Sequence, residues 1–246
     1  MWRLAVPRRQ ARALAAWRAS WALLVFLAAA GAAARDLPPF EDSLAQRLKA
    51  CSACHGPQGR ATNQGYFPRI AGKPAGYLYN QLVNFREGRR RHEAMTYLID
   101  HMSDAYLREI ADHFAGLNLP YPAPQTQTAA RTALERGEQL VRHGDPARGI
   151  PACSTCHGTN MTGIAPAMPG LLGLPRDYLL GQFGGWRNGE RRAVAPDCMK
   201  EIAQRLSADD VGAMADWLSS QPITAGAAPP SMLPKTAPMP CGSGWR

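Results

Sequence analysis

The stretches CSACHG (residues 51–56) and CSTCHG (residues 153–158) decide the fold of this chain. Each has two cysteines three positions apart and a histidine directly after the second cysteine. On a helical turn, side chains three and four positions apart lie on one face, about 5–6 Å from each other. Such a face presents two thiols and an imidazole to one planar group, and this spacing is the attachment signature of a c-type haem. We therefore predict two covalently attached c-type haems, held by Cys51 and Cys54 and by Cys153 and Cys156.

Two other interpretations of these cysteines fit the sequence less well. A shared four-cysteine zinc site usually has its two pairs about 15–20 residues apart, whereas Cys54 and Cys153 are 99 residues apart. A thioredoxin-type dithiol needs a βαβ unit around it, and neither motif lies in such a pattern. Haem attachment remains the favoured interpretation.

The sequence around the two motifs also repeats. FPRIAG (67–72) returns as MPGLLG (168–173), and GYLYNQLVNFREGRRR (76–91) returns as DYLLGQFGGWRNGERR (177–192), both offset by 101 residues. We therefore predict two tandem domains at 35–119 and 131–221. Residues 120–130, rich in proline and glutamine, predict an extended linker. Residues 222–246, rich in proline and alanine, predict a C-terminal tail.

The apolar spacing inside each copy is helical. Apolar residues recur every three or four positions after Ser103 and again after Ser207, and both serines are suited to cap a helix. Ser207 also begins a capping-box pattern that ends at Asp210. No run of alternating polar and apolar residues is long enough for a sheet, so the sequence predicts an all-α fold.

Residues 1–34 have the features of an export signal. Five arginines precede an uncharged apolar stretch, which ends in a small-residue cleavage site at Ala32–Ala34. Because the apolar run is 16 residues, shorter than the ~20 that cross a bilayer comfortably, we expect cleavage, with retention as an uncleaved anchor as the alternative. Removing the five arginines lowers the formal net charge from +9 to +4. This surplus is too small to predict nucleic-acid binding.

Each haem iron needs axial ligands, and the motifs supply His55 and His157. Met95 and Met199 follow these histidines by 40 and 42 residues, and each methionine precedes the capping serine of a closing helix by eight. Core packing is the commoner role of a buried methionine, but the shared spacing favours both as ligands. A thioether opposite an imidazole raises the reduction potential and leaves no site for a substrate on the iron. His92 has no counterpart in the other copy, and a surface or capping role is expected for it.

With these motifs, residues 40–221 resemble the dihaem cytochrome c4 family, which has two class-I cytochrome c domains in tandem. The resemblance implies a periplasmic electron carrier that is soluble or peripherally associated with a membrane. Its implied redox partners are a membrane cytochrome complex or a terminal haem–copper oxidase. The resemblance also implies that the carbonyl groups of Pro68 and Pro169 orient His55 and His157 through their second ring nitrogen.

Two features depart from the family pattern. Arg89–Arg91 make the first copy unusually basic. With Arg191 and Arg192, they would steer acidic partners. A solvated turn, or compensation of haem propionates, is the alternative role for these arginines. The second departure is Cys198, which directly precedes Met199.

The cysteine count bears on Cys198. Four of the six cysteines are assigned to haem, which leaves Cys198 and Cys241. In an exported protein two remaining cysteines permit one disulfide. The hypothesis is that Cys198–Cys241 pins the tail beside Met199. The alternative is that the Cys198 thiolate replaces Met199 on the iron, as in dihaem thiosulfate dehydrogenases.

Three functions follow from these observations. The first is an electron carrier in a respiratory chain with no catalytic activity of its own, and it is the function we expect. The second is a haem-bearing subunit of a periplasmic dehydrogenase or oxidase. The third is a dihaem enzyme, either a thiosulfate dehydrogenase or a peroxidase, which would need a labile or non-methionine ligand on one iron.

Overall fold

The computed structural model describes residues 42–61, 65–223, 229 and 238–243. The chain divides into two compact units, Met1–Arg47 and Leu48–Arg246. In the first unit the described helix is α2 (Leu44–Arg47), and the Ser43 hydroxyl accepts a hydrogen bond from the backbone amide of Gln46 at 3.3 Å. The export signal predicted at residues 1–34 lies outside the described residues. No helix in the described ranges has the length and apolar content needed to cross a membrane.

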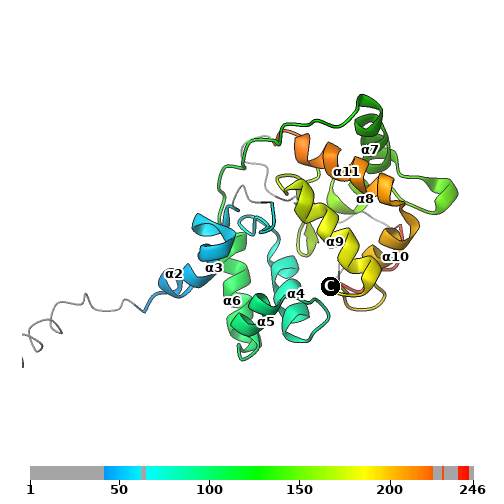
Figure 1. The fold of residues 1–246 in the computed structure, drawn as a ribbon. Coiled ribbons are helices and arrows are strands. Elements are labelled where there is room, and N and C mark those ends of the chain that lie inside the picture. The colour runs from blue at the N-terminus through cyan, green and yellow to red at the C-terminus, as the bar shows by residue number, and fades with distance from the viewer. Residues whose placement is uncertain (1–41, 62–64, 224–228, 230–237, 244–246) are drawn as a thin grey trace, which may run out of the picture. The chain divides into compact units, whose positions relative to one another are not determined.

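The helices of the second unit follow one order twice (Figure 1). A short helix carries the cysteines and the histidine, and a long helix, a short helix and a closing helix come after it. In the first copy these are α3 (Lys49–His55), α4 (Ala75–Arg86), α5 (Glu93–Ile99) and α6 (Asp104–Ala115). In the second copy they are α8 (Cys153–His157), α9 (Arg176–Asn188), α10 (Cys198–Arg205) and α11 (Ala208–Ser220). The prediction of an all-α fold is confirmed.

The remaining elements lie beside the motif helices. The short 3-10 helix η1 (Pro57–Gly59) follows α3, and α7 (Arg131–His143) with the 3-10 helix η2 (Pro146–Arg148) precedes α8. The sequence did not predict the antiparallel pair β1 (Gly163–Ile164) and β2 (Met168–Pro169), in which Gly163 lies opposite Pro169. Strands of two residues show no alternation to detect. A side chain at Gly163 would place its Cβ 2.6 Å from the backbone of Met168 and Gly170, so the pair needs glycine there.

The closing helices pack on the long helices. In the second copy α11 packs against α7 and α9, and in the first copy α6 packs against α4. The apolar positions of both closing helices are buried, as their spacing predicts: Leu107, Ile110, Phe114, Val211, Met214 and Leu218. Burial of each such side chain stabilises the fold by roughly 1.5–3 kcal/mol.

Residues 117–130, between the copies, form no helix or strand, and this segment is anchored at both ends. The Arg69 guanidinium, which is 2% exposed, donates to the carbonyl groups of Leu119 at 2.6 Å and Pro120 at 2.9 Å. Further along, the backbone amide of Gln125 donates to the Ser219 carbonyl in α11 at 2.9 Å. The linker is therefore fixed to each copy by hydrogen bonds.

Asp210 ties three segments of the second copy together. Its backbone amide donates to the Ser207 hydroxyl at 3.0 Å and its carboxylate accepts from the Ser207 amide at 3.2 Å, which forms the predicted capping box. The same buried carboxylate accepts from Arg148 at 2.7 Å and from Arg136 at 2.9 Å. Burial alone would raise the pKa of Asp210, but these hydrogen bonds and charges outweigh it and hold the pKa well below its usual range.

The Asp210→Asn substitution is expected to lower the free energy of unfolding of the second copy by about 3 kcal/mol, because it leaves two arginines without their buried anion. Since the pKa of Asp210 is depressed by folding, its contribution is present above pH ~4 and is lost as the pH falls below that value. Urea unfolding followed by circular dichroism between pH 3 and 7 measures both effects. The control is Asp209→Asn, an exposed neighbour. Equal stability of the two variants at pH 7 would contradict this role of Asp210.

Candidate functional site

The two motif helices place the predicted attachment cysteines at equivalent positions. Cys51 and Cys54 lie in α3, and Cys153 and Cys156 lie in α8. None of the four is part of a disulfide. Burial raises the pKa of Cys51 and raises that of Cys153 to about 12, which favours thiols over thiolates. Protonated thiols outside any disulfide suit cysteines that form thioether bonds to a haem.

The motif histidines are held in one orientation. His55 and His157 are buried, and Nδ1 of each contacts a proline carbonyl oxygen, Pro68 at 2.8 Å and Pro169 at 2.7 Å. A carbonyl can only accept, so Nδ1 carries the proton and Nε2 keeps its lone pair for a metal. Burial lowers the pKa of both histidines, which favours the neutral, metal-binding form. The contacts expected for Pro68 and Pro169 are therefore present in both copies.

The zinc interpretation finds no support in the geometry. Across the described ranges, no three side chains of His, Cys, Asp or Glu gather in a group that could hold a metal ion. One cysteine pair lies in α3 of the first copy and the other lies in α8 of the second.

The two predicted methionine ligands occupy equivalent helices. Met95 lies in α5 and Met199 lies at the second position of α10, and both are half-buried. Helix α5 packs on α4, and α10 packs on α9. The serine eight positions later caps the closing helix in both copies through its hydroxyl. The repeat seen in the sequence is thus a repeat of structure.

Arginine and glutamine side chains of the two copies interlock in what we call the arginine seam, formed by Gln81, Arg90, Gln182 and Arg191. Arg90 donates to Gln81 at 3.0 Å and to Gln182 at 2.7 Å. Arg191 donates to Gln182 at 2.6 Å and to Gln81 at 3.3 Å. The backbones of the two arginines pair as an antiparallel bridge. The 101-residue offset that relates the copies also relates Gln81 to Gln182 and Arg90 to Arg191.

The arginine seam corrects part of the expectation that the arginines at 89–91 and 191–192 steer acidic partners. Arg191 is 8% exposed and Arg90 is half-buried, so neither presents its charge to an approaching partner. Arg91 and Arg192 remain exposed. The sequence did not separate the inward arginines from the outward ones, because each inward arginine is directly followed by an outward one in the same charged run.

The donors around the seam fit a haem. Arg90 lies over the ring of Phe85 at 4.5 Å and Arg191 over that of Trp186 at 3.8 Å, and no ion pair to either arginine occurs among the described residues. Trp186 Nε1 and His92 Nδ1 are buried and lack a hydrogen-bond partner within the same ranges. A haem brings two propionates, which are anions and hydrogen-bond acceptors. The propionates would supply the acceptor that the Trp186 indole lacks and the counter-anion that Arg90 and Arg191 lack among the described residues.

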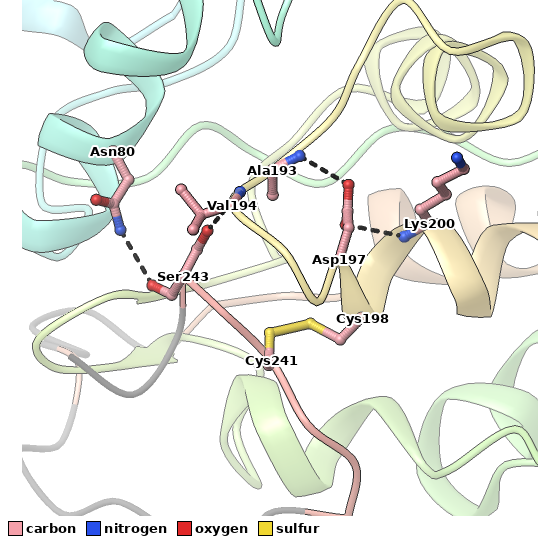
Figure 2. The surroundings of a disulfide bond; sticks show 8 residues. All are labelled: Asn80, Ala193, Val194, Asp197, Cys198, Lys200, Cys241 and Ser243. Atoms are coloured by element: carbon pink, nitrogen blue, oxygen red, sulfur yellow. Dashed lines mark hydrogen bonds between the residues drawn. A yellow bond between two sulfur atoms is a disulfide. The ribbon is translucent and has the colours of Figure 1, made fainter.

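The end of the chain lies beside the helix that carries Met199 (Figure 2). The sulfur atoms of Cys198 and Cys241, the pair that the cysteine count leaves for a disulfide, are 2.03 Å apart. The Ser243 hydroxyl accepts from the Val194 amide at 3.2 Å, and the Ser243 carbonyl accepts from Asn80 of α4 at 3.0 Å. A cysteine in a disulfide has no thiolate to bind iron, so this geometry does not support Cys198 as a haem ligand.

Two copies of one helical domain, each with a cysteine-bearing helix and a histidine oriented by a proline carbonyl, define a dihaem c-type cytochrome. Residues 44–113 match the cytochrome c family. The chain is 34% identical over 181 residues to cytochrome c4 of Pseudomonas aeruginosa, which covers 72% of this chain and 87% of that protein. It belongs to the cytochrome c4 family, with a c-type haem attached at each cysteine motif.

Other relatives extend this comparison. The thiosulfate dehydrogenase electron acceptor of Thiomonas intermedia is 33% identical over 175 residues, 71% of this chain and 80% of that protein. Reduced cytochrome c4 of Pseudomonas stutzeri has a similar structure, with a TM-score of 0.62 at 28% identity, over 71% of this chain and 94% of that one. Thiosulfate dehydrogenase TsdBA of Marichromatium purpuratum gives a TM-score of 0.64 at 29% identity. The match covers 72% of this chain and only 37% of the TsdBA chain.

Proposed function

We propose that this protein is a periplasmic electron carrier whose first haem iron is ligated by His55 and Met95 and whose second is ligated by His157 and Met199. The observation that carries the proposal is the matched orientation of the two histidines, with Nδ1 bound to a proline carbonyl in both copies. The haems supply one-electron redox chemistry when bound. The chain is arranged as domains at 35–119 and 131–221, and residues 1–34 direct its export, with or without retention as an anchor.

The role of the protein in this function is to hold the ligands still and to close the coordination sphere. Pro68 and Pro169 fix the imidazoles, so little ligand movement accompanies a change of oxidation state. Met95 and Met199 would each hold a haem iron through a thioether sulfur, which would favour the reduced iron and leave no open position for a substrate. The seam arginines supply positive charge for the propionates.

The relatives suggest a direction for the electrons. Two relatives known as thiosulfate dehydrogenase electron acceptors are each 33% identical to this chain. We propose that it accepts electrons from a dehydrogenase of that kind and passes them to a membrane cytochrome complex or terminal oxidase, as a soluble or peripherally bound protein. A Cys198–Cys241 disulfide would favour a carrier over an enzyme with a cysteine-ligated haem, since a disulfide-bonded cysteine has no thiolate to offer.

Carbon monoxide tests whether both irons are closed. The purified dihaem protein, reduced with dithionite at pH 7, is expected to show no spectral change under carbon monoxide, because both sixth positions are filled. The Met199→Ala variant is expected to bind about one equivalent of carbon monoxide per chain.

A thiosulfate assay tests for catalytic activity. The protein alone is expected to consume no thiosulfate, but to be reduced when a thiosulfate dehydrogenase is added. Tight gas binding by the unaltered protein, or thiosulfate oxidation without added enzyme, would instead favour the dihaem enzyme.

A further inference from the structure

Lys73 is a buried cation that joins the two copies. It lies in the loop before α4 of the first copy and is 3% exposed. Its Nζ donates to the carbonyl oxygen of Gly170, in the second copy, at 2.7 Å. No carboxylate pairs with it in the part of the chain that the structure describes. Because an ammonium group buried without an anion is costly, burial lowers the pKa of Lys73 to about 7.

The acceptor of Lys73 lies directly after the residue that orients the second histidine. Gly170 follows Pro169, whose carbonyl accepts from His157 Nδ1 at 2.7 Å. A second bond, from the Gly76 amide to the Pro166 carbonyl at 3.0 Å, holds the same loop to the first copy. The loop of the second copy that orients the His157 imidazole is therefore held by two hydrogen bonds from the first copy.

The charged groups near Lys73 do not neutralise it. Arg69, from the same loop, carries the same charge and further lowers the pKa of Lys73. Burial is the main cause that lowers the pKa of His157, and electrostatic repulsion from Lys73 and Arg191 lowers it further. A protonated Lys73 therefore places positive charge on the histidine side of the second haem.

The first haem has no equivalent of this lysine. The repeat aligns FPRIAGK (67–73) with MPGLLGL (168–174), so the counterpart of Lys73 is Leu174, a buried apolar residue. The second site therefore has a buried amine nearby that the first site lacks, while the same alignment places the buried guanidinium of Arg69 opposite Gly170.

We propose that Lys73 is a positioning residue that raises the reduction potential of the second haem and makes it depend on pH, while the first haem lacks this effect. The inference rests on the proposed electron-carrier function. Reduction moves one electron from the donor protein to the iron and lowers the positive charge there. The amine of Lys73 then binds a proton from solvent more readily. The potential is therefore highest at low pH, where the amine is protonated, and it falls as the pH rises through neutrality.

The test is a spectroelectrochemical titration of the full-length dihaem protein between pH 5.5 and 9. The variant Lys73→Gln keeps a donor for Gly170 without the charge, and Lys73→Met removes both. At pH 6 both variants are expected to lower the equilibrium constant for reducing the second haem about tenfold, which is 59 mV for a one-electron couple. At pH 9, where the amine is neutral, the difference should disappear. The matched control is Arg131→Met, which removes an exposed charge from the second copy.

One midpoint potential should move, and it should be the one displaced by Met199→His. The proposal is overturned if the equilibrium constants for reducing both haems stay within twofold of those of the unaltered protein at pH 6. It is also overturned if the midpoint potential of the first haem moves instead. It is equally overturned if only Lys73→Met has an effect, because the charge would then play no part. If Met199→His displaces neither midpoint, the proposed ligation fails, while the effect of Lys73→Gln on one of the two potentials still decides the role of Lys73.

Discussion

Replacing both Cys153 and Cys156 with serine is expected to reduce covalent haem from two to one per chain and to leave the second copy unfolded. A domain of about 90 residues buries little apolar surface for its size, and haem is a large apolar part of its core. Without haem, the buried Trp186 indole of that copy would have no hydrogen-bond acceptor, and the Arg191 guanidinium would have no anion beside its glutamine acceptors. The pyridine haemochrome spectrum counts the haems, and circular dichroism reports the lost helix.

The matched control for this experiment is a variant in which the two cysteines outside the motifs are replaced. Replacing Cys198 and Cys241 with serine also removes two cysteine sulfur atoms, one from the second copy and one from the C-terminal tail, yet both haems should remain. The first copy of the Cys153/Cys156 variant should keep its own absorption spectrum and midpoint potential. Two haems per chain in that variant, or a fully helical second copy, would show that the motif does not hold the cofactor.

The Met199→His variant is expected to lower the midpoint potential of the second haem by on the order of 0.2 V, a quarter of the ~0.8 V range that axial ligands span. A second imidazole stabilises the oxidised iron relative to a thioether. Met95→His should do the same for the first haem. Each variant should also remove about half of the weak near-infrared band that a methionine–iron(III) bond gives.

Two other methionines serve as controls for the ligands. Met161 is buried in the core of the second copy and Met102 is half-buried in the first, and neither has a methionine counterpart. Met161→Leu and Met102→Leu should leave both potentials and the near-infrared band unchanged. A band that survives Met199→His at full strength would assign the ligand to another residue.

The parts of the fold that repeat could be predicted from the sequence. The cysteine motifs, the capping serines and the apolar spacing of the closing helices are local signals, and each occurs twice. The short β1–β2 pair carries no such signal. Two residues per strand are too few for a periodic pattern, and Gly163 is needed there because of a contact with a segment five or more residues away.

The contacts between the copies could not be predicted for a different reason. Gln81 and Arg90 recur as Gln182 and Arg191, which shows that they are part of the repeat but not that they face each other. Lys73 looks like an ordinary loop lysine in the sequence, since lysines are rarely buried. Its burial depends on a loop about 100 residues away, and that proximity is a property of the assembled unit alone.

The arginine seam has a consequence for how such a chain can arise and change. An isologous interface pairs the same patch on two identical subunits, and the seam has that form within one polypeptide. A single ancestral copy already has the residues to make this interface with its twin. Duplication and fusion of the gene would preserve the interface and release each side from strict identity. A substitution such as lysine for leucine can then act on one half alone, which no symmetric homodimer permits.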